Sequence, residues 1–339
     1  MNWVRVIRRL LAWAVGFAAA LYAFILVLDP YQNVPFSPAL PRAPVATNQR
    51  FSYPAIARDG DFEALIMGTS TSRLLDPARL GELAGARFAN LAMNSATAYE
   101  QRRLHALFVR HHPAMRYLVL GIDEAWCQLG PDTMQYTFRA FPEWMYDERT
   151  WNDLAYLFND KALEDAVRML ELLLDAREPK YRRDGYNDFT ADFAARGRAP
   201  VHRRLYGSEP AGAIAEAAVL PAPGPPSWRF GALEQLPALL RATPAGARTV
   251  LFFPPFHARQ IAAHADRLAA CKHHLVALTA DIPDLAVLDY MFVSPLTRDD
   301  DNYWDPLHFT REVATRIERD VAAVLDGRAP AGDSLRVLR

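Results

Sequence analysis

The chain has 339 residues, 51% of them hydrophobic, with 38 basic and 39 acidic residues. This length and hydrophobic content exclude a generally disordered protein and suffice for one large domain with insertions. The net charge of −1 gives no global attraction for nucleic acid, so no nucleic-acid partner is expected.

The first thirty residues predict a membrane-spanning helix. Residues 10–28 contain no charged side chain and approach the length of about 20 residues that crosses the hydrocarbon core of a bilayer. A cleaved signal peptide is the alternative, because residues 18–20 are alanines, but the apolar run continues beyond them and favours an uncleaved anchor. The arginines that precede the run (Arg5, Arg8 and Arg9) place the N-terminus in the cytoplasm. The main domain is then expected on the outer side of the inner membrane, in a periplasm or its equivalent.

Four further segments are expected after the anchor of residues 1–30. Residues 31–60 carry five prolines and little apolar periodicity, which predicts an extended connector. A folded domain is predicted over residues 61–326, with an insertion at about residues 126–248, and a mobile tail over residues 327–339. The two cysteines, Cys127 and Cys271, fit one disulfide outside the cytoplasm, but their pairing stays open at this point.

Five short apolar runs in the folded part predict buried strands, and helical patterns lie between them. Continuous apolar strands that alternate with helices are typical of a parallel sheet covered on both faces. The fold prediction is therefore an α/β protein with a three-layer α/β/α, doubly wound parallel sheet and a helical insertion. The predicted strands are residues 64–67, 87–92, 117–120, 249–253 and 285–288.

The insertion is expected to have structure of its own. Residues 161–177 predict an amphipathic helix with an apolar face formed by Leu163, Val167, Leu170 and Leu174. An aromatic cluster precedes this helix, and a local hydrophobic core beneath a lid is favoured over binding of sugar rings or acyl chains. Residues 211–226 are rich in proline and predict an exposed loop. The aromatic cluster consists of Phe141, Trp144, Tyr146, Trp151, Tyr156 and Phe158.

A serine after the first strand has a possible base and orienting acid near the C-terminus. Ser70 follows the first predicted strand, and ligands of parallel α/β sheets bind beyond the carboxyl ends of strands. Asp305 precedes His308 by three residues, so its carboxylate can orient the imidazole while the other ring nitrogen faces a serine hydroxyl. Ser72 is the alternative nucleophile, ranked lower because it is further from Gly68, which ends the strand.

These motifs resemble four blocks of the SGNH (GDSL-like) hydrolase superfamily, especially its membrane-anchored members in exported acyl-transfer systems. Gly68-Thr69-Ser70 is similar to the Gly-Asp-Ser block, and residues 90–94 and 121–124 are similar to the second and third blocks. Asp305 and His308 match the final Asp-x-x-His block. The resemblance implies that Ser70 is the nucleophile, His308 the base and Asp305 the residue that orients it.

Three residues depart from the family pattern. Thr69 replaces an aspartate, Ala92 replaces the glycine whose amide helps to bind the oxyanion, and Asp123 replaces the oxyanion asparagine. The amide of Ala92 is expected to keep the role of the glycine. An ionised Asp123 would repel the oxyanion, so either Asn94 supplies a donor in its place or Asp123 has a structural task. Arg73, beside the nucleophile, could hold an anionic or sugar substrate, but a surface ion pair is favoured for it.

The function implied by the resemblance is that of a serine esterase or O-acyltransferase acting on acyl groups, with acetyl expected, of a cell-envelope glycan. No metal or organic cofactor is expected. The expected partners are the lipid bilayer, through residues 10–28, the acylated glycan or another ester, and other envelope polysaccharide-modification proteins. The alternative is a catalytically inactive protein that keeps the fold for glycan binding or envelope assembly.

Overall fold

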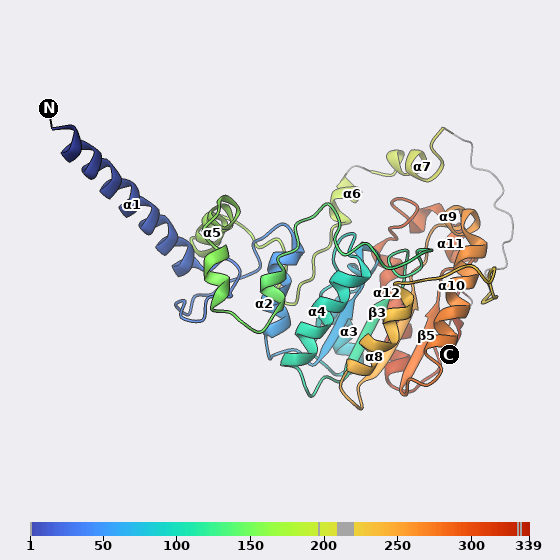
Figure 1. Cartoon of the computed structure of the whole chain (residues 1–339). Helices are drawn as coiled ribbons and strands as arrows, with labels where there is room; N and C mark the ends of the chain where they lie inside the picture. The colour runs from blue at the N-terminus through green and yellow to red at the C-terminus, as the bar shows by residue number, and fades with distance from the viewer. Residues whose placement is uncertain (1, 196, 209–219, 331, 333) are drawn as a thin grey trace. The chain divides into compact units, whose positions relative to one another are not determined.

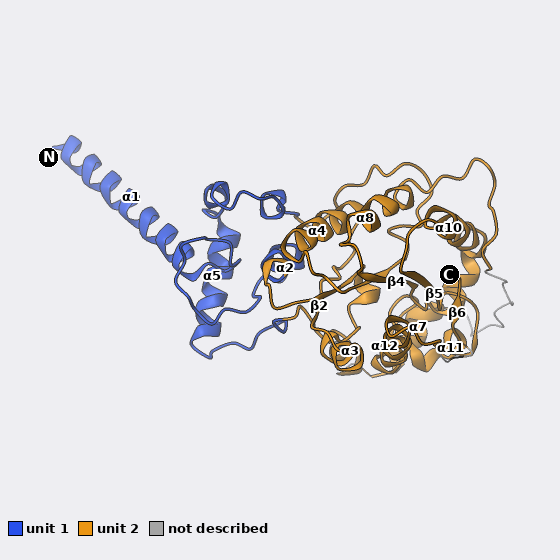
Figure 2. Cartoon of the chain, turned by 90° about the horizontal axis from the view of Figure 1, so that it is seen from below, with its two compact units in different colours: residues 1–56, 141–183 blue, residues 57–140, 184–339 orange. Residues whose placement is uncertain are grey.

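The computed structural model describes residues 2–195, 197–208, 220–330, 332 and 334–339 (Figure 1). The chain divides into two compact units, which are described separately (Figure 2). The first contains Met1–Ile56 and Phe141–Arg183, and the second contains Ala57–Ala140 and Asp184–Arg339. The predicted insertion is therefore not a single body, because its middle part belongs to the first unit and its two ends belong to the second.

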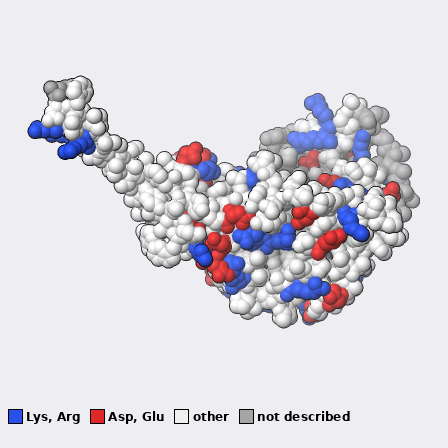
Figure 3. Space-filling model, viewed as in Figure 1, with Lys and Arg blue, Asp and Glu red and all other residues white. Residues whose placement is uncertain are grey.

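The first unit begins with α1 (Trp3–Leu28), which is long and apolar enough to cross a membrane. Asn2 caps this helix by accepting a hydrogen bond from the Arg5 amide. Charged atoms lie only near the N-terminal end of the helix in the space-filling view, and the remaining surface is uncharged (Figure 3). Ile25 and Leu28 are its buried residues, so most of the helix has no protein around it. Bare apolar surface of this extent fits a lipid environment.

The connector predicted over residues 31–60 is not extended, which corrects the sequence interpretation. Its later part forms α2 (Gln49–Arg58). Tyr31 is buried, and its hydroxyl donates to Asp165 Oδ2 at 3.1 Å. The hydroxyl of Tyr146 donates to the Arg50 carbonyl at 2.9 Å. The prolines led to the wrong prediction, because aromatic side chains of this segment, such as Tyr31, are buried in the hydrophobic core.

The third helix of this unit, α5 (Asp160–Leu173), buries a different face from the one predicted. Its buried residues are Ala162, Asp165, Ala166 and Met169. Of the predicted face, Val167 and Leu174 are 43% and 69% exposed. Asp165 can lie in the interior because it accepts hydrogen bonds from Tyr31, Lys161 and Arg168.

The aromatic cluster belongs to the first unit and divides into a buried and an exposed part. Phe141 stacks on the buried Tyr146 with ring centroids 4.3 Å apart. Trp151 and Phe158 remain more than half exposed. A local core thus accounts for part of the cluster. The short 3₁₀ helices that carry it are η2 (Glu143–Tyr146) and η3 (Asn152–Tyr156).

The second unit contains a six-stranded sheet with the order β2-β1-β3-β4-β5-β6. The first five strands are parallel, and β6 runs antiparallel to β5. All five predicted strands are present. The sixth lies within the predicted mobile tail, so that prediction is wrong for Arg336 and Val337. The strands are β1 (Ala64–Met67), β2 (Phe88–Asn90), β3 (Tyr117–Gly121), β4 (Arg248–Phe253), β5 (Leu285–Asp289) and β6 (Arg336–Val337).

Helices lie on both sides of this sheet. Figure 2 shows α4, α8 and α10 on one side and α3 and α12 on the other. Asp76 caps α3 by accepting a hydrogen bond from the Ala78 amide. A capping box of Thr97 and Glu100 starts α4. The helices are α3 (Pro77–Ala84), α4 (Ala98–His111), α6 (Ala191–Ala195), α7 (Ala199–Tyr206), α8 (Leu236–Ala242), α9 (Ala258–Ala263), α10 (Ala265–Leu278), α11 (Pro295–Arg298) and α12 (Arg311–Leu325), with 3₁₀ turns η1 (Ser70–Ser72), η4 (Leu233–Gln235) and η5 (Asp300–Asn302).

A disulfide joins Cys127, in the loop after β3, to Cys271 in α10. The two cysteines are 144 residues apart in sequence. The bond therefore fixes the segment that follows β3 to a helix that packs beside the sheet. The predicted exposed loop at residues 211–226 lies largely outside the described residues.

The direction in which successive strands are added to the sheet reverses between β1 and β3. The chain passes from β1 to β2 on one side, and β3 then pairs with the other side of β1, with Met67 beside Leu120. In open parallel sheets, loops diverge at such a point and leave a crevice at the carboxyl ends of the strands. The residues that follow β1 and β3 are therefore the first place to look for a site.

Candidate functional site

The chain leaves β1 through a tight turn that exposes Ser70 and buries Ser72. Ser72 is fully buried, and its Oγ has no hydrogen-bond partner. The hydroxyl fills the space beside Gly68 and Gly121, because a Cβ on either glycine would collide with it. Ser70 is half-buried and lines two cavities. Of the two serines weighed as the nucleophile, Ser70 is the one that a substrate can reach.

Ser70, His308 and Asp305 come together in a continuous hydrogen-bonded arrangement. His308 Nε2 lies 2.9 Å from Ser70 Oγ, and His308 Nδ1 lies 2.7 Å from Asp305 Oδ2. With its proton on Nδ1, the ring donates to Asp305 and accepts the Ser70 proton at Nε2. Residues from opposite ends of the sequence thus have the geometry of a nucleophile, a base and an orienting acid.

The loop that carries Asp305 and His308 is held by backbone contacts. The amide of Trp304 donates to the His308 carbonyl at 2.8 Å, and the His257 amide donates to the Pro306 carbonyl at 2.9 Å. Burial alone would raise the pKa of Asp305, but hydrogen bonds and the charge of His308 lower this pKa below its ordinary value. Asp305 is thus kept ionised, as orientation of the imidazole requires.

Asp123 is placed to hold the turn around Ser70. Its Oδ2 accepts hydrogen bonds from the Thr69 hydroxyl and, at 2.9 Å, from the Thr71 hydroxyl. Its Oδ1 accepts from the Ala125 amide at 3.0 Å. Burial raises the pKa of Asp123, and these three hydrogen bonds oppose that shift. The structure thus favours the structural task for Asp123, and it shows that two departures from the family pattern, Thr69 and Asp123, contact each other.

The prediction for the Ala92 amide is wrong. Ala92 is fully buried, and its N–H donates to Asn90 Oδ1 at 3.0 Å. The side-chain amide of Asn90 donates to the carbonyls of Ser72 and Leu75 at 3.1 and 2.7 Å. Asn90 therefore ties the end of β2 to the turn that follows Ser70. One sequence feature indicates this role, namely a polar residue at the end of an apolar run.

Ser95 is a further residue that the sequence interpretation missed. It is exposed and lines both cavities beside Ser70. Its φ of 52° lies in the left-handed region, which non-glycine residues seldom adopt and which is often found at functional sites. Ser95, unlike the buried Ala92, is therefore accessible from the cavities beside Ser70. No sequence pattern predicts that a serine at this position adopts the left-handed backbone conformation.

Two cavities meet at Ser70. The larger has a volume of about 720 Å³ and a mixed wall, in which apolar side chains such as Met134 and Phe138 lie beside the acidic residues Glu124 and Asp132. The smaller has a volume of about 420 Å³. Its lining includes His308, so the base faces this side of the nucleophile. The lining residues of the smaller cavity are Ser70, Arg73, Asn94, Ser95, Arg139, Phe189, Phe193 and His308.

Arg73 lies in the wall of the smaller cavity with neutral partners. Its Nη1 donates to Asn94 Oδ1 at 2.8 Å, and its Nη2 donates to Asn187 Oδ1 at 3.2 Å. The guanidinium carbon lies 4.6 Å from the centre of the Phe189 ring. Arg73 is buried and has no carboxylate partner among the described residues. The surface ion pair weighed from the sequence is therefore wrong.

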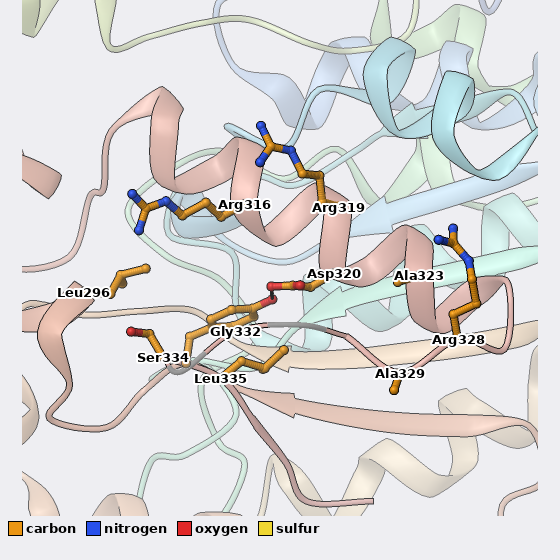
Figure 4. Close-up of a pocket in the computed structure, with 11 residues that line it drawn as sticks. Leu296, Arg316, Arg319, Asp320, Ala323, Arg328, Ala329, Gly332, Ser334 and Leu335 are labelled. Atoms are coloured by element: carbon orange, nitrogen blue, oxygen red, sulfur yellow. Dashed lines mark hydrogen bonds between the residues drawn. The ribbon is translucent and has the colours of Figure 1, made fainter.

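Two other features lie outside the contact series of Ser70, His308 and Asp305. His257 is buried and pairs with Asp300 Oδ1 at 3.0 Å, so it supports a neighbouring loop. A cavity of about 480 Å³ lies beside α12, where Arg316, Arg319 and Arg328 surround it (Figure 4). Its lining contains no histidine that could activate a nucleophile. Across the described residues, no group of three or more His, Cys, Asp or Glu side chains is placed to hold a metal ion.

No protein-family model matches the chain, and no curated protein matches it in sequence. The functional conclusion depends on the geometry of the Ser70 site and on the resemblance of its short motifs.

Proposed function

We propose that this protein is a membrane-anchored serine esterase or O-acyltransferase of the SGNH type. The observation that carries the proposal is the contact series from Ser70 through His308 to Asp305, located where β1 ends and open to two cavities. The parallel order of the first five strands, with helices on both sides, supports a doubly wound three-layer fold of the kind that this superfamily has.

In the proposed reaction, Ser70 Oγ attacks the acyl carbonyl carbon while His308 Nε2 takes the hydroxyl proton. The bond from the acyl carbon to the alcohol oxygen then breaks, and His308 returns the proton to that oxygen. Water or a second alcohol attacks the acyl-serine and regenerates Ser70. Asp305 holds the ring throughout and stabilises the imidazolium.

The proposed oxyanion donors are the backbone amides of Ser70 and Ser95. Ser70 is the first residue of η1, and the first amides of a helix have no acceptor within it. Ser95 supports the proposal through its left-handed backbone beside the nucleophile. Asn94 is assigned to substrate contact, because its side-chain oxygen is turned toward Arg73. Asp123 then acts indirectly by fixing the turn that carries Ser70.

Two observations concern the acceptor of the acyl group and the location of the folded domain. Separate cavities on two sides of Ser70 favour transfer between two bound molecules over simple hydrolysis. The Cys127–Cys271 disulfide and the apolar α1 support a domain held outside the cytoplasm at the inner membrane. We therefore infer an acylated envelope glycan as the substrate, with other polysaccharide-modification proteins as partners.

The test is modification of the full chain, purified in detergent, with a serine-reactive fluorophosphonate, together with hydrolysis of 4-nitrophenyl acetate. Labelling is expected at Ser70, and Ser70→Ala should abolish both labelling and turnover. Ser72→Ala is the matched control and should retain both. Turnover that survives in Ser70→Ala would contradict the assignment.

The alternative is a non-catalytic protein that uses the same crevice to bind a glycan. The engagement of the Ala92 amide and the presence of Asp123 at the oxyanion position favour it. The fluorophosphonate experiment separates the two functions. An inert Ser70 together with binding to an envelope polysaccharide would support the alternative.

A further inference from the structure

The smaller cavity beside Ser70 is lined by basic side chains and by no acidic ones. Its lining contains Arg73 and Arg139 and includes neither aspartate nor glutamate. Arg73 is buried, and its hydrogen bonds go to the neutral oxygens of Asn94 and Asn187. Buried charges in proteins are normally paired with an opposite charge. Among the residues that the structure describes, the charge of Arg73 therefore has no carboxylate partner.

Arg139 shows the same deficiency by an independent observation. Its Nε is buried and has no hydrogen-bond partner. The nearest interaction of its guanidinium is with the ring of Phe138, whose centre lies 4.9 Å away. A buried donor without an acceptor is costly and is expected to be satisfied by something that binds. Arg139 lines the smaller cavity, where an oxygen-rich anion would bring acceptors to its guanidinium group.

The position of His308 indicates which part of the substrate enters this cavity. His308 lines the smaller cavity, and in the proposed reaction its Nε2 delivers the proton to the departing alcohol or removes it from the accepting one. The alcohol part of the ester therefore occupies the smaller cavity. The acyl part, or a second substrate, is left for the larger cavity.

The geometry points to an oxyanion subsite formed by Arg73 and Arg139, which binds a carboxylate, phosphate or sulfate group on the alcohol part of the substrate. This inference rests on the proposed function and narrows its substrate class to anionic alcohols, such as acidic sugar residues. Guanidinium groups suit this role because their planar N–H donors match the oxygens of such anions. Phe189 provides a flat surface beneath Arg73 that keeps the guanidinium oriented.

The test compares two esters of the same shape, 4-acetoxybenzoate and the neutral 4-acetoxybenzamide, with the full chain in detergent. Each kcat/KM is divided by the rate of the same ester with hydroxide, which removes the difference in chemical reactivity. The wild-type chain should prefer the anionic ester by about ten- to hundredfold, the range expected for charge-assisted hydrogen bonds. Equal corrected values for the two esters would overturn the subsite.

Three variants test whether the preference for the anionic ester comes from the two arginines of the subsite or from positive charge elsewhere on the protein. Arg73→Gln and Arg139→Gln should each reduce the preference toward one. Arg139→Gln is the safer variant, because Arg73 also holds Asn94 and Asn187 in place. Arg316→Gln removes a charge of the same sign at the other cavity and should leave the preference unchanged (Figure 4). A preference that persists in Arg139→Gln would also overturn the inference.

A binding experiment keeps the inference testable if neither ester reacts. Saturation-transfer NMR on the full-length Ser70→Ala chain should detect 4-hydroxybenzoate more strongly than 4-hydroxybenzamide, and Arg139→Gln should remove the difference. Turnover of the neutral ester without an anionic preference contradicts only the subsite. Failure of both esters and of fluorophosphonate labelling contradicts the proposed function, while the NMR comparison still decides the subsite.

Discussion

Asp305 holds His308 at two points, through the side chain and through the backbone. Its Oδ2 lies 2.7 Å from His308 Nδ1, and its Oδ1 accepts the His308 amide proton at 2.9 Å. One carboxylate thus fixes both the ring orientation and the loop that carries the ring. The three-residue spacing in the sequence makes both contacts possible.

Asp305→Asn should lower kcat by about 10³- to 10⁴-fold with a much smaller change in KM, because an asparagine favours the wrong imidazole tautomer. The measurement is steady-state ester hydrolysis by the full chain. Asp300→Asn is the matched control, because Asp300 pairs with a different histidine, His257. A loss in Asp300→Asn as large as that in Asp305→Asn would show that disturbance of the loop, not the tautomer, is responsible.

The lowered pKa of Asp305 also predicts a pH effect on stability. A carboxyl group with a folded-state pKa below its unfolded value stabilises the protein above the unfolded pKa, and this contribution is lost as pH falls through the folded pKa. The wild-type chain should therefore lose stability relative to Asp305→Asn as the solution is acidified below the ordinary carboxyl range. Denaturation by urea at several acidic pH values would measure the difference.

Gly121 and Ser72 form a pair that should show strong coupling. A Cβ at Gly121 collides with the Ser72 hydroxyl, so Gly121→Ala should cost about 1–3 kcal/mol of stability. Ser72→Ala removes a buried hydroxyl without a partner and should be neutral or slightly stabilising. The double variant should recover part of the Gly121→Ala loss. Additive effects in a double-mutant cycle would contradict this packing relationship.

The Cys127–Cys271 disulfide should contribute to stability because it closes a long loop between cysteines that are 144 residues apart in sequence. The double variant Cys127→Ala/Cys271→Ala is expected to lose about 2–5 kcal/mol. Urea denaturation of the full chain, with and without a reductant, would measure this loss. The reductant should destabilise the wild-type chain and leave the variant unaffected. A reductant effect on the variant would point to a cause other than this bond.

The candidate triad could be predicted from the sequence because each part is a local pattern. An apolar run that ends in Gly68 delivers Ser70 to the edge of a sheet, and the Asp305–His308 spacing is short enough to be read directly. The parallel sheet was predictable for the same reason, since each strand is a short apolar run between helices. Periodicity did not identify the buried face of α5, because Asp165 is buried there through a hydrogen bond from the distant Tyr31.

The remainder of the site depends on backbone conformation and on distant segments. Nothing in the residue types shows that Ser95 adopts a left-handed φ or that the Ala92 amide turns toward Asn90. Arg139 and Phe189 reach the cavity from segments far from Ser70 in the chain, so no spacing links them to it. Such contacts follow from the packed fold and have no local signature.

The orientation of the chain in a membrane gives a further prediction. If α1 crosses the inner membrane with its N-terminus in the cytoplasm, protease added to the outer side of intact spheroplasts should degrade the sheet-containing unit and spare an N-terminal tag. The protein should also resist extraction with alkaline carbonate. Digestion of the tag in intact spheroplasts would contradict this orientation.

A substitution of Asp123 distinguishes the two roles considered for this residue, contact with the oxyanion and support of the Ser70 turn. Because burial raises the pKa of Asp123 in the folded state, the contribution of this carboxyl group to stability falls as pH rises through the folded pKa. Asp123→Asn has no such titration, so its stability relative to the wild-type chain should improve as pH increases. Its activity should fall through kcat, because an asparagine cannot accept from Thr69, Thr71 and the Ala125 amide at once. If Asp123→Asn instead raises kcat, the residue faces the oxyanion, and the role assigned to it in holding the Ser70 turn is wrong.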